Sequence, residues 1–400
     1  MSEGIRRPRV FMMDLWAIVP YYTAYLSKAL LQEGVNLTVG SITYYLDPGC
    51  FIDRGIKNDP GLIDIVGRFQ LSRLPRRILK MLEAILNLSA LTIRFSFALP
   101  DLIHVQYLPM FRWRLPLDLW FVRYCQRRGS KIVLTVHDLL PHDSGETYKL
   151  TFDGLYRMAD AIICHSDHIQ TKLETEFFVP GEKISVIPHG PFFYDISASD
   201  DEQVLRSFEL EKDSVSVLWQ GIIFPYKGID LLLRSWKYVE AAMDSAWLVI
   251  AGTGSPELLD QIRGQVKDLD LKHVKLHFRF ISTKELVALY RASSVIVYPY
   301  KAITTSGALA TGLALGKAIV ASDLPVFREL LTNGENALLV DPQNSVDLAN
   351  ALIELTQNRP LRERFGQKVR EMNFGDESWR VIAKKTIATY QRVLTETRTH

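Results

Sequence analysis

Short runs of apolar, often β-branched residues alternate with amphipathic segments along almost the whole chain. Six such runs in the first half predict strands, at residues 9–13, 35–40, 102–105, 131–136, 161–164 and 184–187. A helical pattern at residues 21–33 fills the first interval and ends at Gly34. Continuous apolar strands between amphipathic helices are typical of parallel sheets with helices on both faces. The pattern therefore predicts a doubly wound α/β fold.

The alternation breaks once, at residues 192–214, where a polar and acidic segment predicts a linker. It then restarts, with strands predicted at residues 215–219, 247–251, 274–278, 295–298, 318–321 and 337–340. We therefore expect two Rossmann-like domains, residues 1–195 and residues 210–377. Ligands of such sheets bind beyond the carboxyl ends of the strands, and a cleft between two domains is the expected site.

The composition is that of an ordinary globular protein, with 48% hydrophobic and 23% charged residues. The formal charge of +2 argues against a nucleic-acid binder. Three cysteines, Cys50, Cys125 and Cys164, are too few and too scattered for a disulfide framework or a zinc site. No apolar stretch is long enough to span a membrane, and no secretion signal is recognised, so we expect a cytoplasmic protein.

The balanced total hides a basic segment, residues 51–131, which has 14 Lys and Arg against 6 Asp and Glu. Aromatic residues accompany the basic ones between Tyr107 and Trp120. Basic residues beside exposed aromatic residues suit peripheral contact with an anionic membrane, at the inner face of the cell membrane. The alternative is an ordinary pair of helices whose Arg and Lys side chains face water while the apolar side is core.

Histidines follow four of the strands predicted in the first half. They are His104, His137, His165 and His189. A single histidine at a strand end is usually structural, whereas four at successive ends favour a functional group. His137 is the strongest candidate, because an imidazole can donate to a substrate hydroxyl or phosphate oxygen. No glycine lies between Gly4 and Gly34, so the first strand lacks the Gly-rich turn of a dinucleotide cofactor site.

Two strand ends in the second half carry residues suited to phosphate. In the loop at residues 219–228, Gly221 lets the backbone approach a ligand and Lys227 supplies a point charge. After a later strand, the run Thr304-Thr305-Ser306-Gly307 opens a helix. A helix N-terminus of this kind binds anions, although it is also an ordinary N-cap. Because both features lie at the same edge of one predicted sheet, together they favour a phosphate ligand.

Four segments carry family motifs: residues 159–190, the G-x-x-x-x-x-K-G loop at residues 221–228, residues 278–299 and residues 316–340. Together they resemble the retaining, nucleotide-sugar-dependent glycosyltransferases of GT-B fold, especially family 4 (group 1). The resemblance implies two Rossmann-like domains that face a central cleft, with a C-terminal helix, residues 378–400, returning to the first domain. It also implies transfer of a sugar from a nucleoside diphosphate, by default UDP, to a saccharide or lipid-linked acceptor in bacterial polysaccharide or glycolipid synthesis.

The resemblance further implies roles for individual residues. His137 and Lys227 would be catalytic, His137 near the transferred sugar and Lys227 at the departing diphosphate. Donor contacts are expected from Gly221, Tyr226, Lys227, Arg279, Ile281, Thr304, Thr305, Ser306, Gly307, Ala308 and Glu329. For Glu329, a structural role at a helix N-terminus is an equal alternative. No metal and no other cofactor are expected, and acceptor contacts are expected from Trp16, Tyr21, His104 and His189.

The chain departs from the family pattern at several positions. Ile303 and Thr311 stand where the family often has two glutamates. Ile222 and Phe224 occupy the candidate positions for an arginine that commonly accompanies the loop lysine. A non-catalytic nucleotide-sugar-binding protein with a decayed transferase fold is therefore the alternative. A sugar phosphorylase would need a lysine that forms a Schiff base with pyridoxal phosphate, and no segment argues for one.

Overall fold

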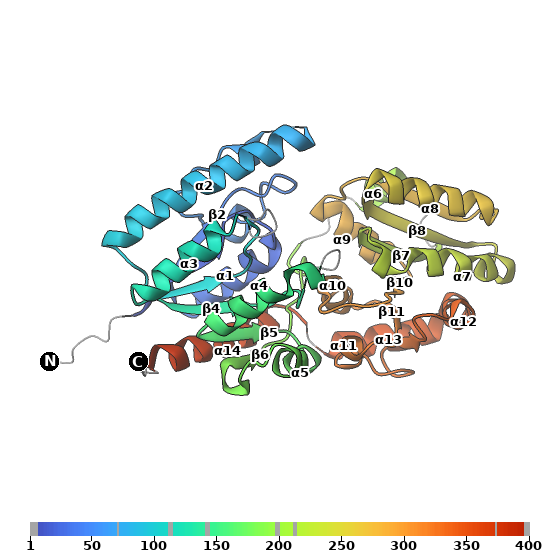
Figure 1. Ribbon diagram of the computed structural model, residues 1–400. Helices are drawn as coiled ribbons and strands as arrows, with labels where there is room; N and C mark the ends of the chain where they lie inside the picture. Colours follow the sequence, from blue (N-terminus) through green and yellow to red (C-terminus); the bar gives the residue numbers. More distant parts are fainter. Residues whose placement is uncertain are drawn as a thin grey trace. The chain divides into compact units, whose positions relative to one another are not determined.

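The computed structural model describes residues 7–69, 72–110, 115–140, 145–196, 201–210, 214–372 and 374–395. The chain divides into two compact units, Met1–His189 with Ser378–His400, and Gly190–Glu377 (Figure 1). Each unit contains a six-stranded sheet in which all strand pairs are parallel. Helices pack on both faces of each sheet, which confirms the predicted doubly wound α/β fold.

The first sheet has the strand order β2-β1-β3-β4-β5-β6. Its strands are β1 (Arg9–Asp14), β2 (Asn36–Ser41), β3 (Leu102–Val105), β4 (Lys131–Thr135), β5 (Ala161–Cys164) and β6 (Ile184–Val186). The helices of this unit are α1 (Pro20–Gln32), α2 (Arg73–Phe97), α3 (Leu117–Arg127), α4 (Gly145–Met158), α5 (Asp167–Glu176) and most of α14 (Asp376–Thr395). Every residue of β3 and β5 is buried, as expected for central strands covered on both faces.

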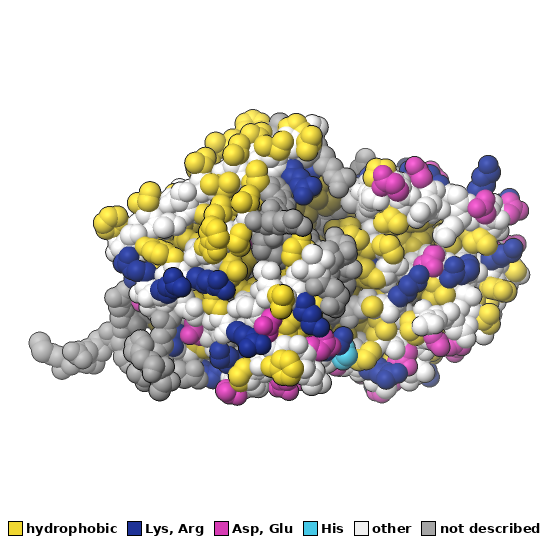
Figure 2. Space-filling model, viewed as in Figure 1, with side chains coloured by type: hydrophobic (Ala, Val, Ile, Leu, Met, Phe, Trp, Pro, Cys, Tyr) yellow, Lys and Arg dark blue, Asp and Glu magenta, His cyan; other side chains and the backbone are white. Residues whose placement is uncertain are grey.

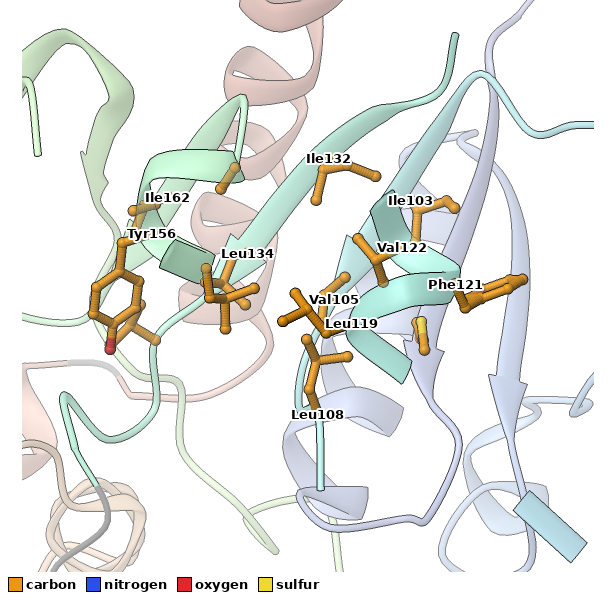
Figure 3. Close-up of a cluster of buried hydrophobic side chains, with 14 of the residues drawn as sticks. Ile103, Val105, Leu108, Leu119, Phe121, Val122, Ile132, Leu134, Tyr156 and Ile162 are labelled. Atoms are coloured by element: carbon orange, nitrogen blue, oxygen red, sulfur yellow. The ribbon is translucent and has the colours of Figure 1, made fainter. Parts of the chain in front are cut away.

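One face of the first sheet packs against α2 to α5 in a single apolar core (Figure 3). Alternate side chains of β3, Ile103 and Val105, point into this core, because successive side chains of a strand face opposite sides. They lie close to Phe121 and Val122 of α3. This face of the sheet is thereby covered by the four helices.

The second sheet has the strand order β12-β11-β10-β7-β8-β9. Its strands are β7 (Val215–Ile222), β8 (Ala246–Thr253), β9 (Val274–Phe278), β10 (Val295–Tyr298), β11 (Ala318–Ser322) and β12 (Leu338–Val340). The helices are α6 (Asp201–Ser207), α7 (Ile229–Ala242), α8 (Pro256–Asp268), α9 (Thr283–Ala292), α10 (Gly307–Ala314), α11 (Pro325–Arg328), α12 (Ser345–Gln357) and α13 (Arg359–Glu371). The segment predicted as a linker contains α6, so that prediction is wrong in part. Phe208 and Leu210, just after α6, are buried in the core of this unit and hold the segment against it.

The C-terminal helix α14 packs on the first unit. Trp379 is 2% exposed and stacks on Tyr25, with ring centres 5.5 Å apart. The Tyr390 hydroxyl lies 2.6 Å from Nδ1 of His104 in β3. Residues that are far apart in the sequence therefore share one core. Among the described residues, no helix is both long enough and apolar enough to cross a membrane.

Candidate functional site

Lys227 lies in the loop that connects β7 to α7. A 3-10 helix, Pro225–Lys227, ends at this lysine, and Gly228 precedes α7. The Trp219 indole N–H donates to the Lys227 carbonyl at 3.4 Å, which fixes the backbone. The Lys227 Nζ lies 5.6 Å from the centre of the Tyr300 ring. The ammonium group is therefore placed beside the segment that follows β10.

Two glycines, Gly221 at the end of β7 and Gly228 in the loop after it, have backbone conformations that disfavour a side chain. Gly221 has a φ of +139°, and a Cβ at this position would lie 2.9 Å from the Lys227 Nζ. Gly228 has a φ of +69°, and its Cβ would lie 1.8 Å from the Pro299 carbonyl oxygen. Both conformations favour glycine. Without these side chains, the lysine folds over the end of β7 and the loop rests on the residues after β10.

The N-terminus of α10 supplies backbone donors on this side of the sheet. Ser306 caps the helix, because its Oγ accepts the N–H of Leu309 at 3.1 Å. The N–H groups of Gly307 and Ala308 belong to the first turn and have no carbonyl partner within the helix. Together with the helix dipole, such groups bind an anion.

Two contacts bring Lys227 and the start of α10 together. The Lys301 N–H donates to the Tyr226 carbonyl at 2.7 Å, which joins the two loops. The Tyr300 side chain hydrogen-bonds to Ser306 and also faces the Lys227 ammonium. Burial raises the pKa of Tyr300 well above its usual value, so the hydroxyl keeps its proton. The Lys227 ammonium and the N-cap residue of α10 thus have Tyr300 as a common neighbour, which is an arrangement suited to a diphosphate.

A buried hydroxyl network beneath α10 fixes its first turn, and the sequence does not reveal it. The Tyr298 hydroxyl donates to the Ala308 carbonyl at 2.7 Å, and the Tyr290 hydroxyl donates to the same oxygen at 3.3 Å. Gln220 Nε2 donates to the Tyr290 hydroxyl at 2.7 Å, across 70 positions of sequence. Burial raises the pKa of Tyr290 to about 12, so this hydroxyl stays protonated. A tyrosine at the end of a predicted strand is the signal that could have drawn attention to Tyr298.

Three other expected donor contacts lie elsewhere in the second unit. Arg279 follows β9 and forms an ion pair with Glu285 at 2.7 Å, while Ile281 is buried in the apolar core. The Arg279 side chain is thus paired and the Ile281 side chain is in the core, which leaves the backbone of residues 279–281 as the expected contact with a nucleotide base. Glu329 is exposed and lies at the C-terminal end of α11, so it does not lie at the N-terminus of that helix.

The residues around the start of α10 include the two positions where the family often has glutamate. Ile303 packs against the apolar core of the second unit. Thr311 is 2% exposed, and its hydroxyl accepts the N–H of Phe192 at 3.3 Å. Thr304 and Thr305 are half-buried in the segment before the helix. This region therefore offers hydroxyl and N–H groups where carboxylates are absent.

In the first unit, three of the four strand-end histidines surround Tyr22 of α1. The ring centres of His137, His165 and His189 lie 4.7, 5.2 and 5.1 Å from that of Tyr22. These histidines follow β4, β5 and β6, which are neighbours in the sheet. Trp379 of α14 contacts the same tyrosine at 5.5 Å. The carboxyl edge of the first sheet thus carries a cluster of imidazole and aromatic rings.

Hydrogen bonds at both ends of this cluster fix the proton positions. His137 Nε2 lies 3.0 Å from Gln106 Oε1, and His165 Nδ1 lies 3.0 Å from the Ile187 carbonyl oxygen. Because both partners are carbonyl oxygens, these two ring nitrogens carry the protons. Burial holds the pKa of His137 well below its usual value and lowers the pKa of His165 to about 4. Both rings are therefore neutral at pH 7.

Burial contradicts one expected acceptor contact, that of His104, and places a second expected residue, Trp16, in the core. His104 lies within β3 with no exposed surface, and its ring nitrogens contact the hydroxyls of Tyr390 at 2.6 Å and Thr135 at 2.7 Å. Burial lowers its pKa to about 3. Trp16 is 8% exposed and belongs to the apolar core of the first unit. The fully buried His104 side chain therefore stabilises the domain and does not reach a ligand.

Asp14, at the end of β1, shapes the turn before α1, the helix that carries another expected acceptor contact, Tyr21, and the sequence pattern indicates no role for this aspartate. Its carboxylate accepts the N–H of Ile18 at 2.9 Å and the Thr23 hydroxyl at 3.1 Å. Burial raises its pKa to about 6. These bonds set the start of α1, where the Tyr21 hydroxyl donates to Asp47 at 2.9 Å.

Two mannosyltransferases are similar to this chain over part of their sequences. A phosphatidyl-myo-inositol mannosyltransferase of Mycobacterium leprae is 32% identical over 43% of this chain and 44% of that protein. An O-antigen chain mannosyltransferase of Salmonella typhimurium is 27% identical over 60% of this chain and 65% of that protein. The chain thus spans less than two thirds of either relative.

Solved structures with low sequence identity share the fold. Sucrose-phosphate synthase of Thermosynechococcus elongatus has a TM-score of 0.71 at 18% identity, covering 98% of this chain and 100% of that one. Anabaena HepE in complex with UDP and glucose has a TM-score of 0.69 at 16% identity, covering 96% and 100%. The family model for Glycosyltransferase Family 4 matches residues 19–190, and the model for Glycosyl transferases group 1 matches residues 200–372. The chain therefore belongs to the group 1, family 4 glycosyltransferases of GT-B fold.

Proposed function

We propose that this protein is a retaining glycosyltransferase that moves a sugar from a nucleoside diphosphate, with UDP as the expected carrier, to an acceptor hydroxyl. The observation that carries the proposal is the Lys227 ammonium beside the N-terminus of α10, linked to it through Tyr300 and Ser306. A fixed cation and backbone N–H groups stabilise a departing phosphate oxygen. They supply the charge that a metal ion supplies in other transferases, so the proposal includes no metal cofactor.

In the proposed reaction, the bond between the anomeric carbon and the diphosphate oxygen breaks as the acceptor oxygen bonds to the same face of that carbon. The Lys227 ammonium and the N–H groups of Gly307 and Ala308 hold the negative charge that develops on the diphosphate. The departing oxygen accepts the proton of the acceptor hydroxyl. Retention follows because attack and departure take place on one face, without a protein nucleophile.

We assign His137 to the sugar and not to the diphosphate. Its lowered pKa leaves the ring neutral at pH 7, so it offers a hydrogen bond in place of a charge. The proposed acceptor is a saccharide or a lipid-linked hydroxyl, in polysaccharide or glycolipid synthesis. The two relatives, a phosphatidyl-myo-inositol mannosyltransferase and an O-antigen chain mannosyltransferase, support this choice.

Acceptor-dependent release of nucleoside diphosphate tests the proposal. The protein is incubated with UDP- and GDP-linked sugars and with saccharide and lipid-linked acceptors, and the anomeric configuration of any product is read by NMR. We expect release that depends on the acceptor, and an α-linked product from an α-linked donor. A β-linked product from that donor would contradict retention.

A non-catalytic nucleotide-sugar-binding protein is the second candidate, because uncharged Ile303 and Thr311 stand where the family often has glutamates. Both candidates predict that a cognate nucleotide stabilises the fold, by about 2.7 kcal/mol at 100 times its dissociation constant. Stabilisation by a donor that is never turned over, with any acceptor tried, would favour this second candidate.

A further inference from the structure

The long helix α2 presents apolar side chains to solvent along its whole length. Six of them are 47–89% exposed: Leu74, Ile78, Leu82, Leu86, Ile93 and Phe97. Spacings of four and seven residues place them on one face of the helix. Figure 2 shows hydrophobic side chains gathered over the region of α2. A helix that only covers a core normally turns polar side chains to water on this face.

The side of α2 that packs on the first sheet is a different one. Ala84, Leu88, Leu91 and Phe95 are buried in the apolar core of the first unit. With 3.6 residues per turn, this set lies on the side of the helix opposite to the exposed set. Core packing therefore accounts for one apolar face of α2 and leaves the outer face unexplained. An exposed apolar band of this length marks a contact site.

The exposed charges of α2 and of its neighbour α3 are of one sign. Each helix has a single acidic residue, Glu83 and Asp118, and both side chains are buried. The Glu83 carboxylate accepts backbone N–H groups of the segment that precedes α2. Among the side chains that the structure describes in these two helices, the exposed charged ones are Arg77, Arg123 and Arg127.

Helix α3 lies beside α2 and adds an exposed aromatic residue to the pair. Ser96 Oγ in α2 lies 2.7 Å from the Tyr124 hydroxyl in α3. The Arg128 guanidinium donates to the Ser96 carbonyl at 3.0 Å. Trp120 of α3 is 57% exposed. Tryptophan together with arginine is typical of protein surfaces at the headgroup level of a bilayer.

We infer that the outer face of α2, with Arg123 and Arg127 on the side of α3 that also carries Trp120, docks this protein on an anionic lipid bilayer. The apolar band enters the boundary between headgroups and acyl chains, and these two arginines attract the lipid phosphates. The helix lies on the surface, because it is not apolar enough to span the membrane. A second copy of the chain fits less well, since a symmetric contact would place basic side chains against each other. The inference does not depend on the proposed transfer reaction.

Co-sedimentation of the full chain with lipid vesicles tests this inference. We expect binding to vesicles of phosphatidylcholine mixed with phosphatidylglycerol, little binding to phosphatidylcholine alone, and weaker binding at high salt. The triple variant Ile78→Ser, Leu82→Ser, Leu86→Ser should partition roughly tenfold or more weakly to anionic vesicles. The matched control is Leu150→Ser, because Leu150 is an 87% exposed leucine on α4 of the same unit. This control should bind as the wild type does.

Circular dichroism and light scattering check that the variants fold and report their size. If the triple variant is unfolded, Leu86→Ser alone replaces it and should still weaken binding. Equal binding by the wild type and the folded variant, or no preference for anionic lipid, would overturn the inference. A wild-type dimer that the variant loses, without lipid binding, would identify a second copy as the occupant and would also overturn it.

Discussion

His104 and His165 are buried in the first unit, and loss of contact with water lowers the pKa of these rings to about 3 and about 4. Neutral rings have one donor and one acceptor nitrogen, and in His165 the Ile187 carbonyl oxygen fixes Nδ1 as the donor. The same physical cause applies to His137, whose pKa is also lowered by burial. At the scale of the residue, burial therefore decides that these imidazoles act through hydrogen bonds and not through charge.

This neutrality predicts a loss of stability in acid. The unfolded chain takes up a proton at His165 near pH 6.5, whereas the folded chain does so near pH 4. The contribution of the neutral His165 ring to the free energy of unfolding is therefore complete above pH 6.5. This contribution falls by roughly 3 kcal/mol as the pH falls from 6.5 towards 4. Denaturant unfolding of the wild type and of His165→Gln across this range measures the effect. The variant should show a flatter pH dependence, and identical slopes would contradict this account.

At the scale of the element, the turn from β7 to α7 depends on one glycine. Gly228 has a φ of +69°, and an added Cβ would lie 1.8 Å from the Pro299 carbonyl oxygen. We expect Gly228→Ala to lower the free energy of unfolding by about 2 kcal/mol or more, as measured by denaturant titration. Gly264→Ala in α8 is the matched control, because nothing lies within 4 Å of its added Cβ. Alanine should stabilise that helix by up to about 1 kcal/mol. Wild-type stability of the Gly228 variant would disprove the close contact.

The elements are predictable from the sequence where the pattern is local. Strands such as β4 and β10 follow from apolar runs, because both faces of each sheet are covered. Helix α6 is not predictable in this way, since its segment is polar and acidic. Only Val204 and Leu205 of the helix pack against the core, and Phe208 and Leu210 after it are buried there. The hydroxyl network beneath α10 joins Gln220 and Tyr290, which are 70 positions apart, so no local pattern reveals it.

At the scale of the whole molecule, the candidate site follows from the sequence only in part. The positions of Lys227 and His137 at strand ends are predictable, because the carboxyl ends of parallel strands share one edge of each sheet. The burial of His104 is not predictable, because its cover is Tyr390, which is 286 positions away on α14. The exposure of the outer face of α2 is not predictable either. The helix has two apolar faces, and tertiary packing decides which of them is buried in the core.

The return of α14 to the first unit predicts a large effect at Trp379. This side chain is 2% exposed and contacts the rings of Tyr22 and Tyr25, each at 5.5 Å. We expect Trp379→Ala to lower the free energy of unfolding by about 3–5 kcal/mol. Val381→Ala is the control on the same helix, because Val381 is 44% exposed. It should change stability by no more than about 0.5 kcal/mol. Similar effects of both variants would show that α14 does not pack as described.

Turnover of the Lys227→Ala variant tests the central claim most directly. If the Lys227 ammonium stabilises the departing diphosphate, its removal should reduce kcat by about 100- to 1000-fold while the protein stays folded. Lys368→Ala is the matched control, because Lys368 is an exposed lysine of α13 in the same unit that pairs with Glu371 at 3.0 Å. The control should turn over donor as the wild type does. Unchanged kcat in a folded Lys227→Ala variant would contradict the account.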